Sequence, residues 1–63
     1  MKAETIDGAK KMAKAKSLEK RGESIFIIYC RRTQYYCIAC DGLIRSWEQL
    51  IGCYEDGEYT AEK

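Results

Sequence analysis

Four cysteines are the residues of this chain best suited to chemistry. They are Cys30, Cys37, Cys40 and Cys53, with the spacing C-x6-C-x2-C-x12-C. Four thiolates suffice for one tetrahedral zinc ion. A second CxxC pair is absent, however, and residues 37 and 40 would point to opposite faces of a regular strand. We therefore expect packed, inert cysteines with no metal, and keep a structural zinc site made of all four as an alternative.

Other catalytic groups are scarce. The chain has no histidine, so a cysteine nucleophile lacks its usual imidazole partner. Neither a glycine-rich phosphate loop nor a Walker motif is present. The acidic residues fall mostly at expected helix ends and in the C-terminal tail, where solvation accounts for them. The sequence therefore predicts a protein that is not an enzyme and needs no cofactor.

Basic residues suggest nucleic acid as an alternative ligand. Their candidate positions are Lys10, Lys11 and Lys14 in the N-terminal third, and Arg31 and Arg32 further on. Cations with tyrosines nearby are the usual ingredients of such a surface. The simpler interpretation is that the lysines form a solvated helix face. We therefore favour protein binding and keep nucleic-acid binding as the alternative.

The length of 63 residues predicts a single domain spanning 1–63. A chain this short buries only about 60% of the surface exposed by its unfolded form, and such domains often gain stability from oligomerisation. The first eleven residues lack an apolar stretch of signal-peptide length, and no run approaches the roughly 20 residues that span a bilayer. We expect a cytoplasmic protein that does not enter a membrane.

The elements that must position these residues begin with a helix over 5–21. This stretch is rich in Ala, Lys, Met, Leu and Glu, which favour helix. Thr5 or Asp7 is placed to cap its start, and Gly22 to end it. Its apolar stripe is thin, and its small alanines would permit close packing against a sheet.

Two apolar runs, 25–30 and 35–40, predict a β-hairpin around the loop 31–34. If Cys30 pairs with Tyr35, alternate residues separate into two apolar faces. One face then contains Phe26, Ile28, Cys30, Tyr35, Cys37 and Ala39, and the other contains Ile25, Ile27, Tyr29, Tyr36, Ile38 and Cys40.

The C-terminal third predicts a second helix. Ser46 opens a capping-box pattern, and Trp47, Leu50, Ile51 and Tyr54 follow at i, i+3, i+4 and i+7. Asp41-Gly42 signals a tight turn, after which residues 43–45 would form a short third strand. The fold class is thus α+β, with element order α-β-β-(β)-α and an antiparallel hairpin sheet packed against two helices.

This element order resembles that of double-stranded-RNA-binding domains. In that family the second helix presents lysines to phosphate. Here the stretch 47–56 carries Glu48, Glu55 and Asp56 and no cation, so the resemblance does not extend to the RNA-binding residues.

A hairpin with two apolar faces needs more cover than a short chain supplies, which predicts an interface. We expect the interface on the face that contains Ile25, Ile27, Tyr29, Tyr36 and Ile38, because Ile and Tyr combine apolar area with a polar handle. The predicted function is non-enzymatic protein binding, as a homodimer. A small inhibitor or adaptor of the phage-accessory type is the kind of protein that we expect.

Overall fold

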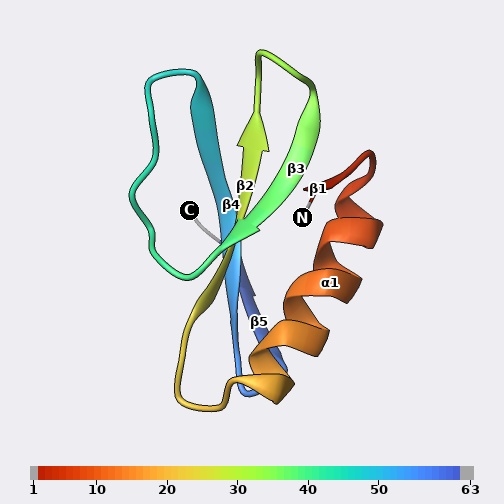
Figure 1. Ribbon diagram of the computed structural model, residues 1–63, viewed down its shortest axis with the longest axis vertical. Coiled ribbons are helices and arrows are strands. Elements are labelled where there is room, and N and C mark those ends of the chain that lie inside the picture. Colours follow the sequence, from red (N-terminus) through yellow and green to blue (C-terminus); the bar gives the residue numbers. More distant parts are fainter. Residues whose placement is uncertain (1, 62–63) are drawn as a thin grey trace.

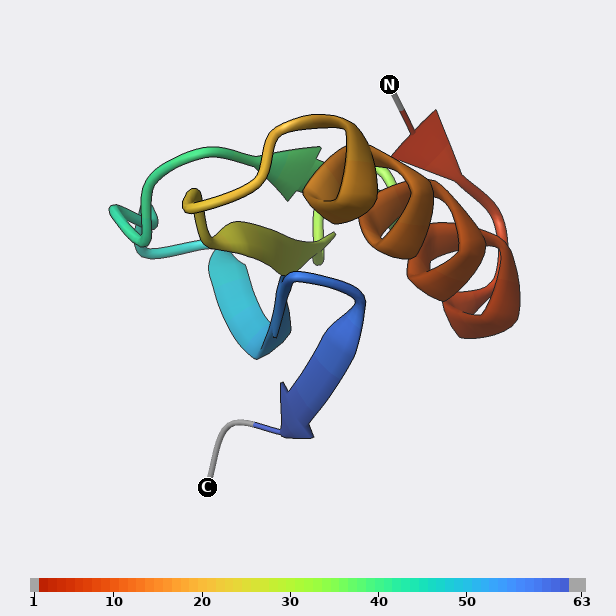
Figure 2. The ribbon, with the colours of Figure 1, turned by 90° about the horizontal axis from the view of Figure 1, so that it is seen from below.

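The computed structural model describes residues 2–61, which form one helix and five strands. The elements are β1 (Lys2–Ala3), α1 (Ile6–Glu19), β2 (Ile25–Cys30), β3 (Tyr35–Ala39), β4 (Glu48–Glu55) and β5 (Glu58–Ala61). All neighbouring strands are antiparallel, in the order β1-β3-β2-β4-β5. The sheet is strongly twisted, and α1 lies along one side of it (Figures 1 and 2).

The helix packs closely on the sheet because its buried residues are small. Ala9, Ala13 and Ser17 recur every fourth position and are fully buried, so they form one stripe on the helix. They contact the core formed with Ile25 and Ile27 of the central strand β2. Close helix-to-sheet packing therefore needs no large side chain from α1.

The predicted first helix forms, and it is shorter at its C-terminal end. The Oγ1 of Thr5 accepts a hydrogen bond from the Gly8 N–H at 3.1 Å, which makes Thr5 the N-cap. The helix ends at Glu19, and Gly22 has a φ of 88° in the following turn. A positive φ is the conformation that glycine adopts without strain.

The register that the sequence left open is the one in which the two apolar runs pair end to end. Cys30 pairs with Tyr35, and Ile27 pairs with Ile38. One face of the hairpin therefore contains the buried Ile25 and Ile27, and the other contains Phe26, Ile28 and Cys37.

The prediction of two helices is wrong, because residues 48–55 form strand β4. A β-bulge where β4 faces Ile27 and Ile28 explains the misleading pattern. The bulge places Ile51 and Tyr54, three residues apart, on the helix side of the sheet and Leu50 and Cys53 on the other, so apolar residues recur at a helix-like spacing in an extended strand. Gly52 in the middle of the segment also disfavours a helix, by about 1 kcal/mol relative to alanine.

Two smaller elements are corrected with it. Residues 43–45 form no strand and belong to a loop over residues 40–47. The tail that follows Gly57 forms the edge strand β5. Without the second helix, the element order no longer resembles that of double-stranded-RNA-binding domains.

The turn between β4 and β5 is fastened to the helix. Asp56 and Gly57 have φ values of 51° and 85°, as in the tight hairpin turns favoured by Asp-Gly. The buried Ser17 hydroxyl donates to the Lys14 carbonyl at 2.8 Å and accepts from the Gly57 N–H at 3.0 Å. This pair of hydrogen bonds joins α1 to the far hairpin of the sheet.

Gly52 is required by the ring of Tyr59. A Cβ at position 52 would lie 2.7 Å from the Thr60 carbonyl oxygen and 2.8 Å from Tyr59 ring atoms. Tyr59 also stacks on Tyr54, with ring centroids 5.1 Å apart. The β4–β5 hairpin can pair in this register only with no side chain at position 52.

We predict that Gly52→Ala lowers the free energy of unfolding by about 1–3 kcal/mol, the usual range for overpacking. Thermal and urea unfolding of the purified variant measure the loss. Gly42→Ala is the matched control, since its Cβ would lie 3.5 Å from the Phe26 ring, an ordinary contact distance. Equal stability of the Gly52→Ala variant and the wild type would contradict this account of the hairpin.

Candidate functional site

The face predicted as an interface lies under α1. Ile25 and Ile27 are 1% and 0% exposed and belong to the core, and Tyr36 and Ile38 pack against it half-buried. Tyr29 is half-buried, with its ring centroid 4.9 Å from that of Tyr36. These five residues share one face of the hairpin, and α1 packs on the part of that face that contains Ile25 and Ile27.

On the opposite side of the sheet, residues 2–61 supply no helix. The apolar side chains of this side, which together define the open face, are Phe26, Ile28, Cys37, Ala39, Leu50 and Cys53. Ile28 at its centre is buried, and the others are half-buried. The sequence contained the signal for this surface, because Phe26, Ile28, Cys37 and Ala39 form the second apolar set of the hairpin.

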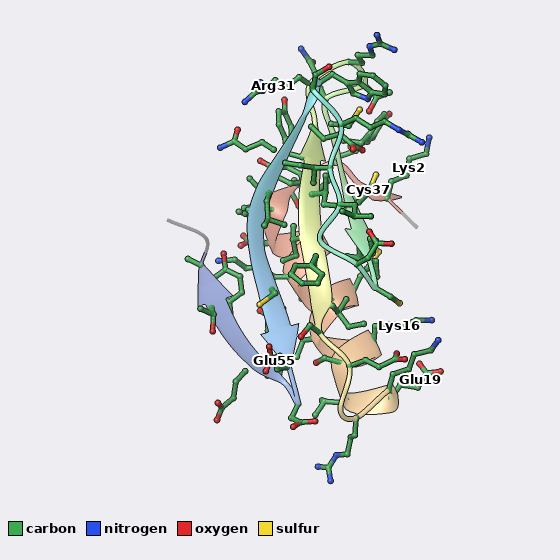
Figure 3. The ribbon with its side chains drawn as sticks, turned by 90° about the vertical axis from the view of Figure 1, so that its left-hand side faces the viewer. Lys2, Lys16, Glu19, Arg31, Cys37 and Glu55 are labelled. Carbon is green, nitrogen blue, oxygen red and sulfur yellow. The ribbon has the colours of Figure 1, made fainter. Side chains whose placement is uncertain are left out.

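The loop over residues 40–47 lies on part of the open face. A Cβ at Gly42 would be 3.5 Å from the Phe26 ring, which places the loop backbone against that ring. In Figure 3 the loop passes in front of β2 and β3, while β4 and β5 lie beside it without cover. The open face is therefore stepped, with a raised half over β2 and β3 and a lower half over β4 and β5.

Two apolar side chains project from the raised half. Leu43 is 84% exposed and Ile44 is 43% exposed. Hydrogen bonds between residues close in sequence hold the loop that carries them. The Asp41 carboxylate accepts from the Leu43 N–H at 3.2 Å, and the Glu48 carboxylate accepts from the Arg45 N–H at 2.7 Å. Apolar groups held in this way are presented to solvent by a defined backbone.

A second cluster lies at the end of the β2–β3 hairpin. We call it the cationic tip, and it consists of Arg31, Arg32, Arg45 and Trp47. The guanidinium carbons of Arg32 and Arg45 lie 3.9 and 5.5 Å from the Trp47 ring centroid. The Arg31 N–H donates to the Trp47 carbonyl at 2.9 Å, which binds the hairpin turn to the start of β4. Beside the tip, the Lys2 ammonium lies 5.3 Å from the Tyr35 ring centroid.

The residues of the predicted nucleic-acid surface do not form one patch. Arg31 and Arg32 are at the hairpin end, which extends beyond the helix in Figure 1, whereas the lysines lie along α1. Lys10 is placed over the Tyr59 ring, 4.6 Å from its centroid, and Lys11 and Lys14 are exposed. Sequence reasoning missed Arg45 and Trp47 as neighbours of the two arginines, since it placed residue 47 in a helix.

The cysteines are spread over the sheet. In the antiparallel register, Cys30 is opposite Tyr35, Cys37 is opposite Ile28, and Cys53 is opposite Phe26, while the exposed Cys40 follows β3. Within residues 2–61, no three His, Cys, Asp or Glu side chains converge as metal ligands. The alternative of a four-cysteine zinc site therefore has no geometric support in this part of the chain.

A shallow groove of about 280 Å³ lies between α1 and β3. It is lined by Lys16, Ile25, Ile38, Ala39 and Cys40. Within residues 2–61, the Lys16 ammonium and the Cys40 thiol at this groove form no hydrogen bond with one another. Over the same described span, no helix is both long enough and apolar enough to cross a membrane.

Comparisons of the chain with protein-family models, with curated proteins and with solved structures found no match.

The pKa of the Cys30 thiol lies below its ordinary value. The Thr33 hydroxyl and then the Thr33 N–H hydrogen-bond to the Cys30 sulfur, and the Arg32 N–H adds a smaller contribution. These donors stabilise the thiolate and lower the pKa of Cys30. A thiol with a lowered pKa is more nucleophilic at neutral pH, because a larger fraction is deprotonated.

We predict that Cys30 reacts with iodoacetamide at lower pH in the folded protein than in protein unfolded by urea. Mass spectrometry of the digested protein would follow the alkylation of the Cys30 peptide across pH. Thr33→Val removes the first of the donors, so it should shift the Cys30 profile back toward the unfolded one. Superimposable profiles in all three samples would contradict the proposed thiolate stabilisation.

Proposed function

We propose that this protein is a non-enzymatic protein-binding module whose open face binds a second copy of the chain. The stepped apolar surface carries this proposal. Leu43 and Ile44 are exposed on the loop over the open face, and Leu50 and Cys53 are half-buried on β4. The one helix of the described residues lies on the other side of the sheet. Contiguous apolar surface of this kind marks interaction sites on soluble proteins.

The shape of the step favours a second copy as the partner. In a symmetric dimer, the two open faces would face each other across a two-fold axis. The raised loop of each copy would then lie on the lower β4–β5 half of the other copy. Each surface would then bury Leu43 and Ile44 against Leu50 and Cys53. This self-complementarity is what a symmetric dimer interface requires.

The charges on the open side are compatible with the same arrangement. Lys2 lies on the edge strand β1. Glu55 and Glu58, which are cross-strand neighbours in the β4–β5 hairpin, lie at the opposite corner of the sheet, next to the turn. A two-fold axis running across the line from Lys2 to Glu58 places each lysine opposite a glutamate of the other copy. Opposed charges at the rim of an interface set its orientation more than its strength.

The available area is sufficient for a modest dimer. The backbone measures 30 × 20 × 19 Å. A face of 30 × 20 Å offers about 600 Å² per copy, near the lower limit of stable interfaces, which bury roughly 1,200–2,000 Å² in total. We therefore expect a dimer that dissociates at low concentration.

The wider assignment rests on the same surface. A self-associating module fits an inhibitor or adaptor that acts by binding proteins. The accessible thiols of Cys30, Cys37 and Cys40 fit a reducing compartment such as the cytoplasm.

We predict that light scattering after size exclusion, in reducing buffer, gives a mass approaching twice 7.3 kDa as the concentration rises. Adding a chelator should leave this mass unchanged. Leu43→Asp should weaken association by at least about 30-fold, the effect of removing one hot-spot side chain. Leu43 is exposed, so the Leu43→Asp variant should stay folded, and circular dichroism of the variant checks that a loss of association does not come from unfolding.

Ala15→Asp is the matched control. Ala15 is exposed on α1, away from the open face, so the same added charge should leave the dimer intact. A wild-type protein that stays monomeric at every concentration would overturn the proposal. Equal loss of association in both variants would also overturn it, since the effect would then follow net charge and not the open face.

A further inference from the structure

The cationic tip is a surface that protein binding through the open face leaves unused. It lies at the end of the molecule, where Arg31 is seen at the upper end of the sheet in Figure 3. Its members come from two segments, 31–32 and 45–47, that the fold brings together. We propose that the cationic tip binds single-stranded nucleic acid, a function that goes beyond self-association.

The charge of the tip is not neutralised within the fold. Arg31, Arg32 and Arg45 are all exposed. Arg32 and Arg45 contact the Trp47 ring, and no described acid forms an ion pair with any of the three guanidinium groups. The Glu48 carboxylate accepts from the backbone of Arg45 and not from its guanidinium. Three cations are therefore available to phosphate groups.

The aromatic ring gives the tip a second capability. Arg32 lies 3.9 Å from the Trp47 centroid, so its planar guanidinium is held in place by the indole. A guanidinium ordered in this way offers an outer face on which a base can stack, as well as N–H groups that fit phosphate. Tyr35, itself beneath the Lys2 ammonium, extends the surface on the neighbouring strand.

These features favour a single strand over a duplex. Stacking on an aromatic or guanidinium plane requires an unpaired base, because bases within a duplex are already stacked on one another. The tip is a hairpin turn beside a loop, and no helix of the described chain is placed there to enter a groove. A site of three arginines suits a few nucleotides of flexible strand.

The test is fluorescence anisotropy of a labelled oligonucleotide of about 12 nucleotides, in DNA and RNA versions. Binding should weaken with salt between about 50 and 200 mM, with a log–log slope near −2, as expected for three phosphate contacts on a single strand. The Arg31→Gln/Arg32→Gln variant should lower affinity at least about tenfold and bring the slope to about −0.7, because one contact remains. Arg31→Gln alone repeats the test with the arginine whose guanidinium forms no hydrogen bond, ion pair or ring contact with the described residues.

Two controls distinguish the tip from charge in general. Lys11→Gln/Lys14→Gln removes the same charge from exposed positions of α1 and should leave affinity within about twofold, since these lysines lie away from the tip. Arg32→Lys keeps the charge but loses the planar group, so the slope should persist while affinity falls about threefold.

Absence of any anisotropy change at about 50 mM salt would overturn the proposal. Equal losses in the arginine and lysine double variants would overturn it too. Unlabelled single strand, duplex DNA and inorganic polyphosphate are then compared as competitors. If duplex DNA or polyphosphate competes as well as the single strand, the tip is a general anion-binding patch, and the assignment to single-stranded nucleic acid is wrong. Failure of self-association would leave these results unaffected, because the four residues of the cationic tip are not among those that define the open face.

Discussion

The packing of α1 against the centre of the sheet is the interaction on which the rest of the structure depends. Ala9 and Ala13 are fully buried against Ile25 and Ile27, so a thin helix stripe is enough to close the core. Burying an isoleucine side chain contributes about 1.5–3 kcal/mol. Because the described chain supplies only one helix, this solution covers one face of the sheet and leaves the other to a loop.

That asymmetry explains the arrangement of both candidate surfaces. The loop over residues 40–47 crosses the open face from the end of β3 to the start of β4. Its backbone at Gly42 rests on Phe26, while Leu43 and Ile44 are left exposed. At its far end the same loop brings Arg45 and Trp47 to the hairpin arginines. One connection therefore builds the step of the open face and completes the cationic tip.

Local sequence signals were enough to predict the first helix and the hairpin, and they left the hairpin register open. Thr5 satisfies an early helical N–H, and the two apolar runs can pair so that Ile27 faces Ile38. The second helix could not be rejected from periodicity alone, because the bulge beside Ile51 gives a strand the spacing of a helix. Gly52 and the Asp56-Gly57 turn were the sequence features that favoured a hairpin there.

The choice of exposed face also depended on tertiary packing. Both faces of the hairpin are apolar in the sequence, and which one the helix covers is decided by how the alanines of α1 fit over β2. Long-range neighbours such as Arg32 and Trp47 follow from the path of the loop, which no local pattern specifies. Sequence reasoning thus identified two apolar faces and a basic loop. It did not show which apolar face α1 leaves uncovered, or which residues lie beside the arginines of the loop.

The most direct test of the central account is methyl NMR of the protein at increasing concentration. If the open face binds a second copy, the methyl signals of Leu43, Ile44 and Leu50 should shift together with concentration, while those of Ile25 and Ile27 under α1 stay fixed. Shifts confined to Ile25 and Ile27, or no shifts at any concentration, would contradict the assignment of the open face as the interface.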